Sequence, residues 1–336
     1  MTGHLMGVGM LRVTNARVKR LLPLSKAIQL AREAYMKLAR GEAENPPRAW
    51  LSVARGASIY FMPAYLHGQK TVAVKAARVN PDNSKASLPT VLLTLYVYDS
   101  TTGALLAEVE GEWLTAIRTA ASTAVATDIL ARKTTRVLGI FGTGAEAKSH
   151  IPALQLVREF EKVLVYSRDR KRREAFAKKM TKETGISIVA TDASKVARES
   201  DVIVTVTTSP KPVFDGSLIS EGTHVNAIGS ALPTAREVDS GLVERSLVVV
   251  DSKTQALATY GDIIMPLEEK AIRVSQILEL GQILTGESKF SRRHGSVTLF
   301  KAGGVAVLDA MMANHIVGSL QSGSAIPTTL KKPRNF

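Results

Sequence analysis

From about residue 137 onward, short apolar runs alternate with stretches that have helical spacing. The apolar runs lie at 137–141, 163–166, 186–191, 202–207, 224–229 and 247–251, and helical stretches near 145–159 and 170–184 separate the first three. The later runs are continuously apolar and rich in β-branched residues, which is typical of strands covered on both faces. Six such strands with intervening helices predict an α/β fold with a Rossmann-type, doubly wound parallel sheet.

The first 120 residues follow a different pattern. Apolar spacing predicts a helix near 26–40, which ends at the turn signals around Gly41. Strand-like runs follow at 50–54, 58–62, 71–78 and 90–98, separated by turn residues, so we expect a second, mixed α+β unit. The alanine-rich stretch 115–132 and a stretch at about 303–318 predict two further helices.

Length and composition allow two domains with full cores. The chain has 336 residues, of which 45% are hydrophobic and 22% are charged. The sequence contains no apolar run of 18 residues, so we expect no membrane span. The stretch MTGHLMGVGM is short and lightly charged for a signal peptide, and the absence of cysteine excludes disulfides, thiolate metal sites and cysteine nucleophiles. We therefore expect a cytoplasmic protein.

The net charge of +14 comes from 44 basic and 30 acidic residues. These basic residues are spread along the chain and form no recognisable nucleic-acid module, so we expect a basic surface with an anion site and no nucleic-acid partner. The six histidines show no paired ligand spacing, and we expect no metal site.

A glycine-rich turn follows the first predicted strand of the parallel sheet. It reads Gly142-Thr143-Gly144-Ala145-Glu146-Ala147, a G-x-G-x-x-A pattern between a strand and a helix. Gly142 permits the tight turn, Gly144 lets the backbone approach a pyrophosphate, and Ala147 lets the helix pack on the strand. The free N–H groups at the helix start then attract phosphate, so the turn predicts a nicotinamide dinucleotide site.

The choice between NAD and NADP depends on the end of the second strand. An NAD enzyme places an acid there for the ribose 2′-hydroxyl, whereas a 2′-phosphate needs cations. Ser167 stands at the position expected for the acid, with Arg168 and Arg170 after it. This favours NADP(H) over NAD(H), although Asp169 keeps NAD open, because a shift of two residues would make it the ribose ligand.

Segments along nearly the whole chain resemble the ornithine cyclodeaminase/mu-crystallin family. The matching segments are Asn45-Pro-Pro-Arg48, Phe61-Met-Pro-Ala64, Val74-Lys75, Asn80-Pro-Asp-Asn83, Gly111-Glu-Trp-Leu-Thr-Ala-Ile-Arg-Thr-Ala-Ala121, the glycine turn, Ala227-Ile-Gly-Ser230, Arg236-Glu-Val-Asp239, Tyr260-Gly-Asp-Ile263 and Thr298-Leu-Phe300. The resemblance implies an NAD(P)-binding Rossmann domain at 121–304, inserted into a substrate-binding and dimerisation domain made of 1–120 and 305–336. It also implies a homodimer with the active site between the two domains.

Residue by residue, the resemblance makes Arg48 and Arg118 the arginines for the substrate carboxylate and Lys75 the active-site lysine. It adds Thr119, Thr207 and Gly229 to the residues expected around the cofactor. Guanidinium groups suit a carboxylate because they bind it in a bidentate fashion. A lysine beside the substrate nitrogen can exchange a proton when burial and neighbouring cations lower its pKa.

Two positions depart from the cyclodeaminase pattern. Family cyclodeaminases have a glutamate two residues before the Met-Pro pair and an aspartate two residues after the glycine of the fifth strand, whereas this chain has Tyr60 and Ala231. Ring closure with loss of ammonia needs such a base, so cyclodeaminase activity is disfavoured. The Gly-Ser-x-x-Pro-x-x-Arg-Glu pattern at 229–237 resembles cyclic ketimine and pyrroline-2-carboxylate reductases instead, and the spacing of Thr234 and Glu237 also predicts a capped helix start.

These observations favour an NADPH-dependent oxidoreductase that reduces cyclic imino acids such as pyrroline-2-carboxylate or piperideine-2-carboxylate. An alanine or other amino-acid dehydrogenase, an opine-type reductase, an ornithine cyclodeaminase and a non-catalytic cofactor-binding relative remain as alternatives.

Overall fold

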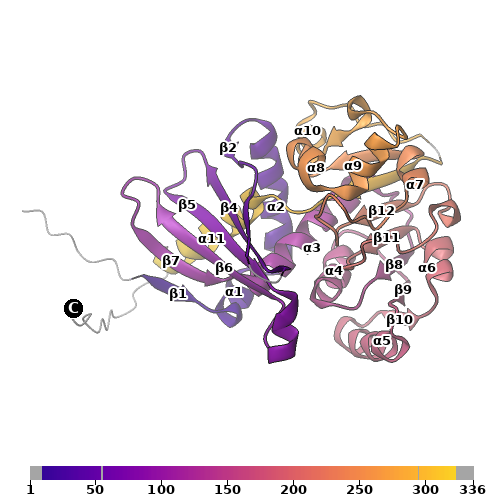
Figure 1. The fold of residues 1–336 in the computed structure, drawn as a ribbon, viewed down its shortest axis with the longest axis horizontal. Coiled ribbons are helices and arrows are strands. Elements are labelled where there is room, and N and C mark those ends of the chain that lie inside the picture. Colours follow the sequence, from indigo (N-terminus) through magenta and orange to yellow (C-terminus); the bar gives the residue numbers. More distant parts are fainter. Residues whose placement is uncertain (1–9, 54–55, 294, 323–336) are drawn as a thin grey trace, which may run out of the picture.

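The computed structural model describes residues 10–53, 56–293 and 295–322, which form two β-sheets with helices packed around and between them (Figure 1). The first sheet comprises β1 (Leu11–Val13), β2 (Ala43–Glu44), β3 (Ala49–Ser52), β4 (Ser58–Leu66), β5 (Thr71–Val79), β6 (Val91–Asp99) and β7 (Leu105–Glu110). Its order is β1-β7-β6-β5-β4-β2, with β3 also paired to β4. Among the described strands of this first sheet, only the β1–β7 pair is parallel, so the sheet is mixed, as predicted.

The second sheet is parallel throughout its described strands. It comprises β8 (Val137–Phe141), β9 (Lys162–Tyr166), β10 (Ser187–Ala190), β11 (Val202–Thr205), β12 (His224–Ala227), β13 (Ser246–Val250), β14 (Leu278–Glu279) and β15 (Val297–Lys301). The order β10-β9-β8-β11-β12-β15-β13-β14 reverses direction between β8 and β11. This reversal is the switch point at which doubly wound sheets bind ligands, and it confirms the predicted fold class.

β15 was not among the six predicted strands, yet it lies inside the sheet between β12 and β13. All five of its residues are buried. A run of five residues that ends in lysine carries too little periodicity to identify a strand.

The helices are α1 (Asn15–Leu21), α2 (Leu24–Ala39), α3 (Gly111–Leu130), α4 (Ala145–Gln155), α5 (Arg170–Thr184), α6 (Ala193–Glu199), α7 (Ser240–Glu244), α8 (Lys253–Thr259), α9 (Gly261–Glu268), α10 (Leu280–Thr285) and α11 (Ala306–Ser322). Most of α3 is buried. It packs on helix α2 and on strand β6 of the first sheet, and it also packs on helix α4 and on strands β12 and β15 of the second sheet. Its many alanines allow this close approach on several sides.

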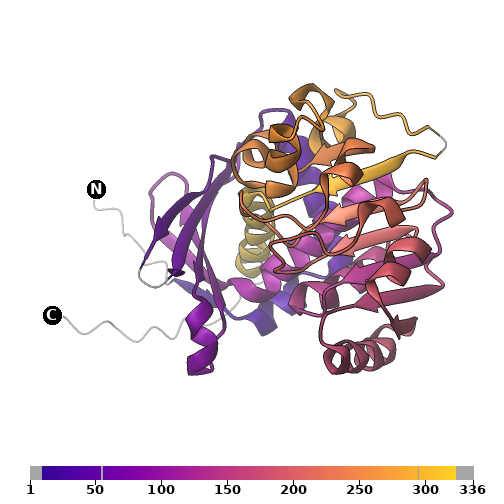
Figure 2. The ribbon, with the colours of Figure 1, turned by 45° about the vertical axis from the view of Figure 1, so that its right-hand side comes forward.

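Helix α11 brings the end of the described chain back to the first sheet, where it packs on α2, β4 and β5 (Figures 1 and 2). The segment 302–305 that leads into it therefore crosses from one sheet to the other. The predicted division into 121–304 and 1–120 with 305–336 stays a prediction, and its last part, 323–336, lies outside the described residues.

No helix in the described part of the chain is long and apolar enough to cross a membrane. Within the same residues, no group of three or more His, Asp or Glu side chains is placed to hold a metal ion.

Candidate active site

Two of the predicted cations meet on one buried carboxylate. Lys75 on β5 places its Nζ 2.6 Å from Oδ2 of Asp309 on α11, and Arg118 on α3 places its Nε 3.3 Å from the other oxygen, Oδ1. Lys75 and Asp309 are each 2% exposed and Arg118 is 7% exposed. Three elements distant in sequence thus fix the lysine and the arginine relative to each other.

Burial is the main cause that lowers the pKa of Lys75, to about 8. The positive charge of Arg118 lowers this pKa further, while Asp309 opposes both effects. An ammonium group with a pKa near neutrality can release and regain a proton, which suits a general acid or base.

Arg48, the third predicted cation, reaches the segment between the two sheets. Its Nη2 donates to Oε1 of Gln255 at 2.9 Å and to the carbonyl oxygens of Gly303 and Gly304 at 3.4 Å. Its Nε is buried and has no hydrogen-bond partner among the described residues. One donor of this guanidinium is therefore unpaired within the described part of the chain.

Gly304 fits tightly beside Arg118. Its φ is +89°, and a Cβ added to it would lie 2.4 Å from Nη1 of Arg118. Its N–H donates to Oδ2 of Asp251, whose other oxygen accepts from the hydroxyl of Tyr260, both at 2.9 Å. A residue without a side chain is required here, because any larger residue would push the arginine away.

A cavity of about 230 Å³ opens beside Arg118. It is lined by Arg118, Thr119, Ser122, Glu146, Val206, Thr207, Thr208, Ile228, Gly229, Ala231, Ala302, Gly303 and Gly304. A second cavity of about 480 Å³ runs along the glycine turn, and it is lined by Phe141, Gly142, Thr143, Gly144, Tyr166, Ser167, Arg168, Asp169, Arg172, Val206, Thr207, Thr208, Ser209, Pro212 and Val213. The shared residues 206–208 show that the two cavities adjoin at the switch point of the parallel sheet.

The glycine turn fits the diphosphate of a dinucleotide. Gly142 has a φ of +119°, and a Cβ there would lie 2.6 Å from the carbonyl oxygen of Val206. A Cβ on Gly144 would meet nothing within 4 Å, so the backbone is open to a ligand at that point. No side chain caps the start of α4, which leaves its first N–H groups available to phosphate oxygens.

Most of the predicted cofactor residues lie on these two cavities. Gly142, Thr143, Gly144, Ser167 and Arg168 line the larger one, Thr119, Glu146 and Gly229 line the smaller one, and Thr207 lines both.

Ala145 and Arg170 do not line either cavity. Arg170 points along the surface of α5 and pairs with Glu174 at 2.8 Å, with 78% of its side chain exposed. Arg172 lines the larger cavity in its place, because Asp169 caps α5 through the N–H of Arg172 at 3.0 Å and so sets the phase of the first turn. The prediction missed this arginine because helix phase follows from the cap and not from the run of cations.

A third cavity, of about 450 Å³, lies beside Arg48 and shares the lining residue Ala231 with the 230 Å³ cavity. Its lining includes Tyr60, Leu232 and Pro233. The two positions that depart from the cyclodeaminase pattern, 60 and 231, therefore face the same space.

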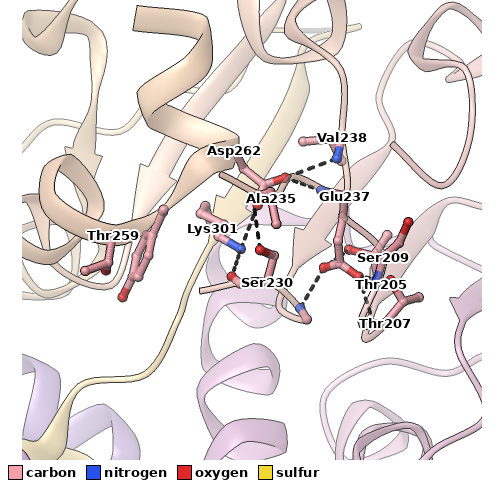
Figure 3. A network of polar contacts seen from close by, with 12 residues as sticks. Thr205, Thr207, Ser209, Ser230, Ala235, Glu237, Val238, Thr259, Asp262 and Lys301 are labelled. Carbon is pink, nitrogen blue, oxygen red and sulfur yellow. Dashed lines mark hydrogen bonds and ion pairs between the residues drawn. The ribbon is translucent and has the colours of Figure 1, made fainter. Parts of the chain in front are cut away.

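A buried polar network supports the loop that follows β12 (Figure 3). The carboxylate of Glu237 accepts hydrogen bonds from the hydroxyls of Thr205 and Thr207 and from the N–H groups of Thr207 and Gly229, at 2.6–2.8 Å. Thr207 and Gly229, which line the cavities, are thus held by one side chain from below. A carboxylate with four donors is a rigid anchor.

The second half of this network is an ion pair with no solvent exposure. Lys301 on β15 lies 2.9 Å from Asp262 on α9, and both side chains are 0% exposed. Lys301 also donates to the carbonyl oxygen of Ser230, and Asp262 accepts from the N–H groups of Glu237 and Val238 (Figure 3). The pair joins the strand, the helix and the loop around the site.

The spacing of Thr234 and Glu237 starts no helix, so this part of the prediction is wrong. Glu237 is drawn inward by its four donors, and α7 begins only after Asp239, whose side chain accepts from the N–H of Leu242 at 2.8 Å. The tertiary partners of Glu237 outweigh the local capping preference.

Comparison with known proteins identifies the family. The model of the ornithine cyclodeaminase/mu-crystallin family matches residues 10–324. The chain belongs to this family. Membership of the ornithine cyclodeaminase/mu-crystallin family confirms the resemblance that the sequence motifs indicated.

Three similar proteins illustrate the relationship. The chain is 34% identical over 311 residues to a Δ1-pyrroline-2-carboxylate reductase of Bacillus cereus, which covers 91% of this chain and 95% of the relative. It is 37% identical to the solved Δ1-pyrroline-2-carboxylate reductase of Thermococcus litoralis in complex with NADH and L-proline, with a TM-score of 0.90 over 93% of this chain and 98% of that one. An archaeal alanine dehydrogenase dimer with bound NAD is 28% identical, with a TM-score of 0.89 over 96% and 99%.

The sequence predicts Lys75, Arg48 and Arg118 as site residues but not Asp309, the carboxylate that contacts Lys75 and Arg118. Asp309 is the lone acid in the otherwise apolar stretch 305–313, a pattern that indicates a buried and paired charge. This isolated acid is the sequence signal that points to Asp309.

Proposed function

We propose that this protein is an NADPH-dependent reductase of cyclic imino acids, with pyrroline-2-carboxylate and piperideine-2-carboxylate as the substrate type. The observation that carries the proposal is the meeting of Lys75 and Arg118 on Asp309, beside a cavity that adjoins the glycine turn. The names of the similar reductases from Bacillus cereus and Thermococcus litoralis support the same reaction.

The three cations divide two tasks in this proposal. Arg118 and Arg48 bind the substrate carboxylate, since Arg118 lines the 230 Å³ cavity and Arg48 lines the 450 Å³ cavity that shares Ala231 with it. Lys75 delivers a proton to the substrate nitrogen, and Asp309 holds the lysine at the required place. The nicotinamide, when bound, supplies the hydride for the imine carbon. The residues thus contribute orientation, charge and one proton.

The residues at positions 60 and 231 argue against ring closure of ornithine. A cyclodeaminase needs a carboxylate to activate the attacking amine, whereas the third cavity has a phenol and a methyl group at these positions. An imine substrate already contains the C=N bond and needs no such base. The same two residues therefore support imine reduction.

An assay of substrate classes tests this function. We expect NADPH oxidation with the cyclic imines to exceed that with pyruvate plus ammonia, and L-ornithine to yield no proline. Pyruvate reduction that depends on ammonia and exceeds imine reduction would instead favour an alanine dehydrogenase, the activity named for the archaeal dimer.

We also propose NADP(H) as the preferred cofactor. The cavity at the end of β9 is lined by Ser167 and by the two arginines Arg168 and Arg172. The carboxylate of Asp169, which also lines this cavity, is engaged by the N–H of Arg172 at 3.0 Å. Two guanidinium groups suit a 2′-phosphate, because arginine binds phosphate in a bidentate fashion.

Replacement of Arg168 by aspartate should reverse this preference. The new carboxylate repels the 2′-phosphate and accepts from a ribose 2′-hydroxyl, so we expect kcat/KM for NADPH to fall by about 100-fold relative to that for NADH. Steady-state kinetics with both nucleotides measures the ratio. Arg170→Asp is the matched control, because Arg170 lies outside the cavity, and the two variants behaving alike would contradict the assignment.

We propose a homodimer in the cytoplasm as the working form. Large apolar side chains are exposed on the first sheet, namely Trp50 and Leu51 at 59% each, Val91 at 40% and Phe61 at 39%. Such side chains on one sheet are typical of a surface that another chain covers. Light scattering coupled to size exclusion should give twice the mass of the chain.

A further inference from the structure

One acidic side chain in the site has no task in the reaction described so far. Glu146 lies in the first turn of α4 and lines the 230 Å³ cavity together with Arg118. Among the described residues that line this cavity, Glu146 alone is acidic. Its Oε2 is buried and has no hydrogen-bond partner in the described part of the chain.

The other carboxylates near the site are already engaged. Asp309 pairs with Lys75 and Arg118, Asp251 accepts from Tyr260 and Gly304, and Glu237 accepts four hydrogen bonds. Each of these acids stabilises a contact within the protein. Glu146 differs because an oxygen of its carboxylate is left for a ligand.

The backbone at Glu146 is held by side chains of its own helix. Its carbonyl oxygen accepts from Nδ1 of His150 at 2.7 Å and from the hydroxyl of Ser149 at 2.9 Å. Nε2 of His150 lies 3.0 Å from the hydroxyl of Thr123 on α3. Burial lowers the pKa of His150 to about 4, so this ring is neutral and adds no charge to the cavity near neutral pH.

The balance of charge indicates what Glu146 binds. Arg118 lines the 230 Å³ cavity and Arg48 lines the 450 Å³ cavity, and the charge of the buried Lys75 also acts on Glu146. Asp309 and Asp251 compensate part of this positive charge. On the sheet side, the lining residues Val206, Thr207, Ile228 and Gly229 are uncharged. The nitrogen of a cyclic imino acid is bonded to the carbon that bears the carboxylate, and in its protonated form it needs a negative neighbour in a buried site.

We propose that the Glu146 carboxylate pairs with the protonated nitrogen of the substrate and so selects ligands in which the atom next to the carboxylate-bearing carbon is a cationic nitrogen. This assignment rests on the proposed function, because it places the substrate carboxylate on the arginines. A carboxylate at position 231 would pair with the substrate nitrogen. In this chain Glu146, which lies on α4, takes that role instead. Hydride addition to the carbon turns the protonated imine nitrogen into a neutral amine, and Lys75 then delivers its proton to that amine.

The ionisation of Glu146 is consistent with this role. Burial raises its pKa to about 7, while Arg118 and Lys75 lower it. A cationic nitrogen placed beside the carboxylate lowers this pKa further. The side chain is therefore ionised when the substrate is bound, and binding weakens as the pH falls below about 7.

Calorimetry with two ligands of equal shape tests the pairing. L-Proline has a ring nitrogen that is protonated, and (S)-tetrahydrofuran-2-carboxylate has an uncharged ring oxygen at the same position. Each is titrated into the NADP⁺ complex of the wild type and of Glu146→Gln, which preserves the shape and removes the charge. We expect the substitution to weaken proline binding by about 10- to 100-fold and to leave the oxygen analogue within about twofold.

Two controls separate this effect from damage to the site. Glu159→Gln removes the same charge from an exposed position just beyond α4 and should change neither affinity. The Kd for NADPH should be equal in the wild type and in Glu146→Gln, because the substitution keeps the backbone N–H that residue 146 contributes to the start of α4. Any of four results would overturn the role of Glu146. Glu146→Gln could weaken the binding of both ligands equally, weaken the binding of neither, or raise the Kd for NADPH. The fourth result is a wild type that binds neither ligand. Imine turnover by the wild type, measured in parallel, tests the proposed function separately.

Discussion

Replacement of Lys75 by methionine should lower kcat/KM for imine reduction by about 10²- to 10⁴-fold, the range of a lost general acid. Methionine fills similar space, and Arg118 remains beside Asp309 to compensate its charge. The fold and the cofactor site should therefore survive. Steady-state kinetics measures the loss, while the thermal midpoint and the Kd for NADPH report whether the protein is intact.

The pH profile links this effect to proton transfer. Lys75 is protonated below its pKa of about 8, so the wild type should lose kcat/KM for imine reduction as the pH rises through this value. Lys75→Arg keeps a positive charge that does not titrate in this range, and its profile should lack that decline. Wild-type kcat/KM in Lys75→Met would contradict a role for the lysine in the reaction.

Replacement of Lys301 by methionine should lower the free energy of unfolding by about 3–5 kcal/mol, the typical effect of removing one partner of a buried ion pair. The substitution leaves Asp262 charged at a position with no exposure to solvent. The lost hydrogen bond to the carbonyl oxygen of Ser230 adds to the effect. Denaturant unfolding measures the difference.

Two comparisons make this second prediction specific. Lys301→Met combined with Asp262→Asn should recover part of the loss, because the charge left unpaired is removed while the acceptor for the N–H groups of Glu237 and Val238 remains. Lys195→Met, which breaks an exposed pair with Glu199, should have a much smaller effect. Equal losses in Lys301→Met and Lys195→Met would show that the buried pair does not stabilise the fold.

The parallel sheet and the glycine turn were predictable from sequence because their signals are local. A continuous apolar run, a turn with Gly142 and Gly144, and a helix start follow one another within twenty residues. Each step depends on neighbours in the chain, so periodicity and turn chemistry are sufficient. The strand β15 could not be predicted in this way. Its position inside the sheet follows from pairing with β12 and β13, and the periodicity of the sequence carries no information on strand pairing.

The polar contacts of the site could not be predicted in the same way. Lys75 and Asp309 are 234 positions apart, and Arg48 and Gln255 are 207 positions apart. Glu237 shows the limit most clearly, since its local spacing predicts a helix cap but its distant donors Thr205 and Gly229 determine where it points. The family motifs predict Arg48, Lys75 and Arg118 as site residues. The side chains that contact them become known only from the fold.

The proposed reaction moves a hydride from the nicotinamide to the imine carbon, and an isotope label on the nicotinamide follows this transfer. The protein is incubated with pyrroline-2-carboxylate and NADPH that carries deuterium in both positions at C4 of the nicotinamide, and the proline formed is analysed by mass spectrometry. We expect one deuterium in the product, at the α-carbon that carries the carboxylate. Proline without deuterium, or no proline beyond that in a reaction without protein, would contradict it.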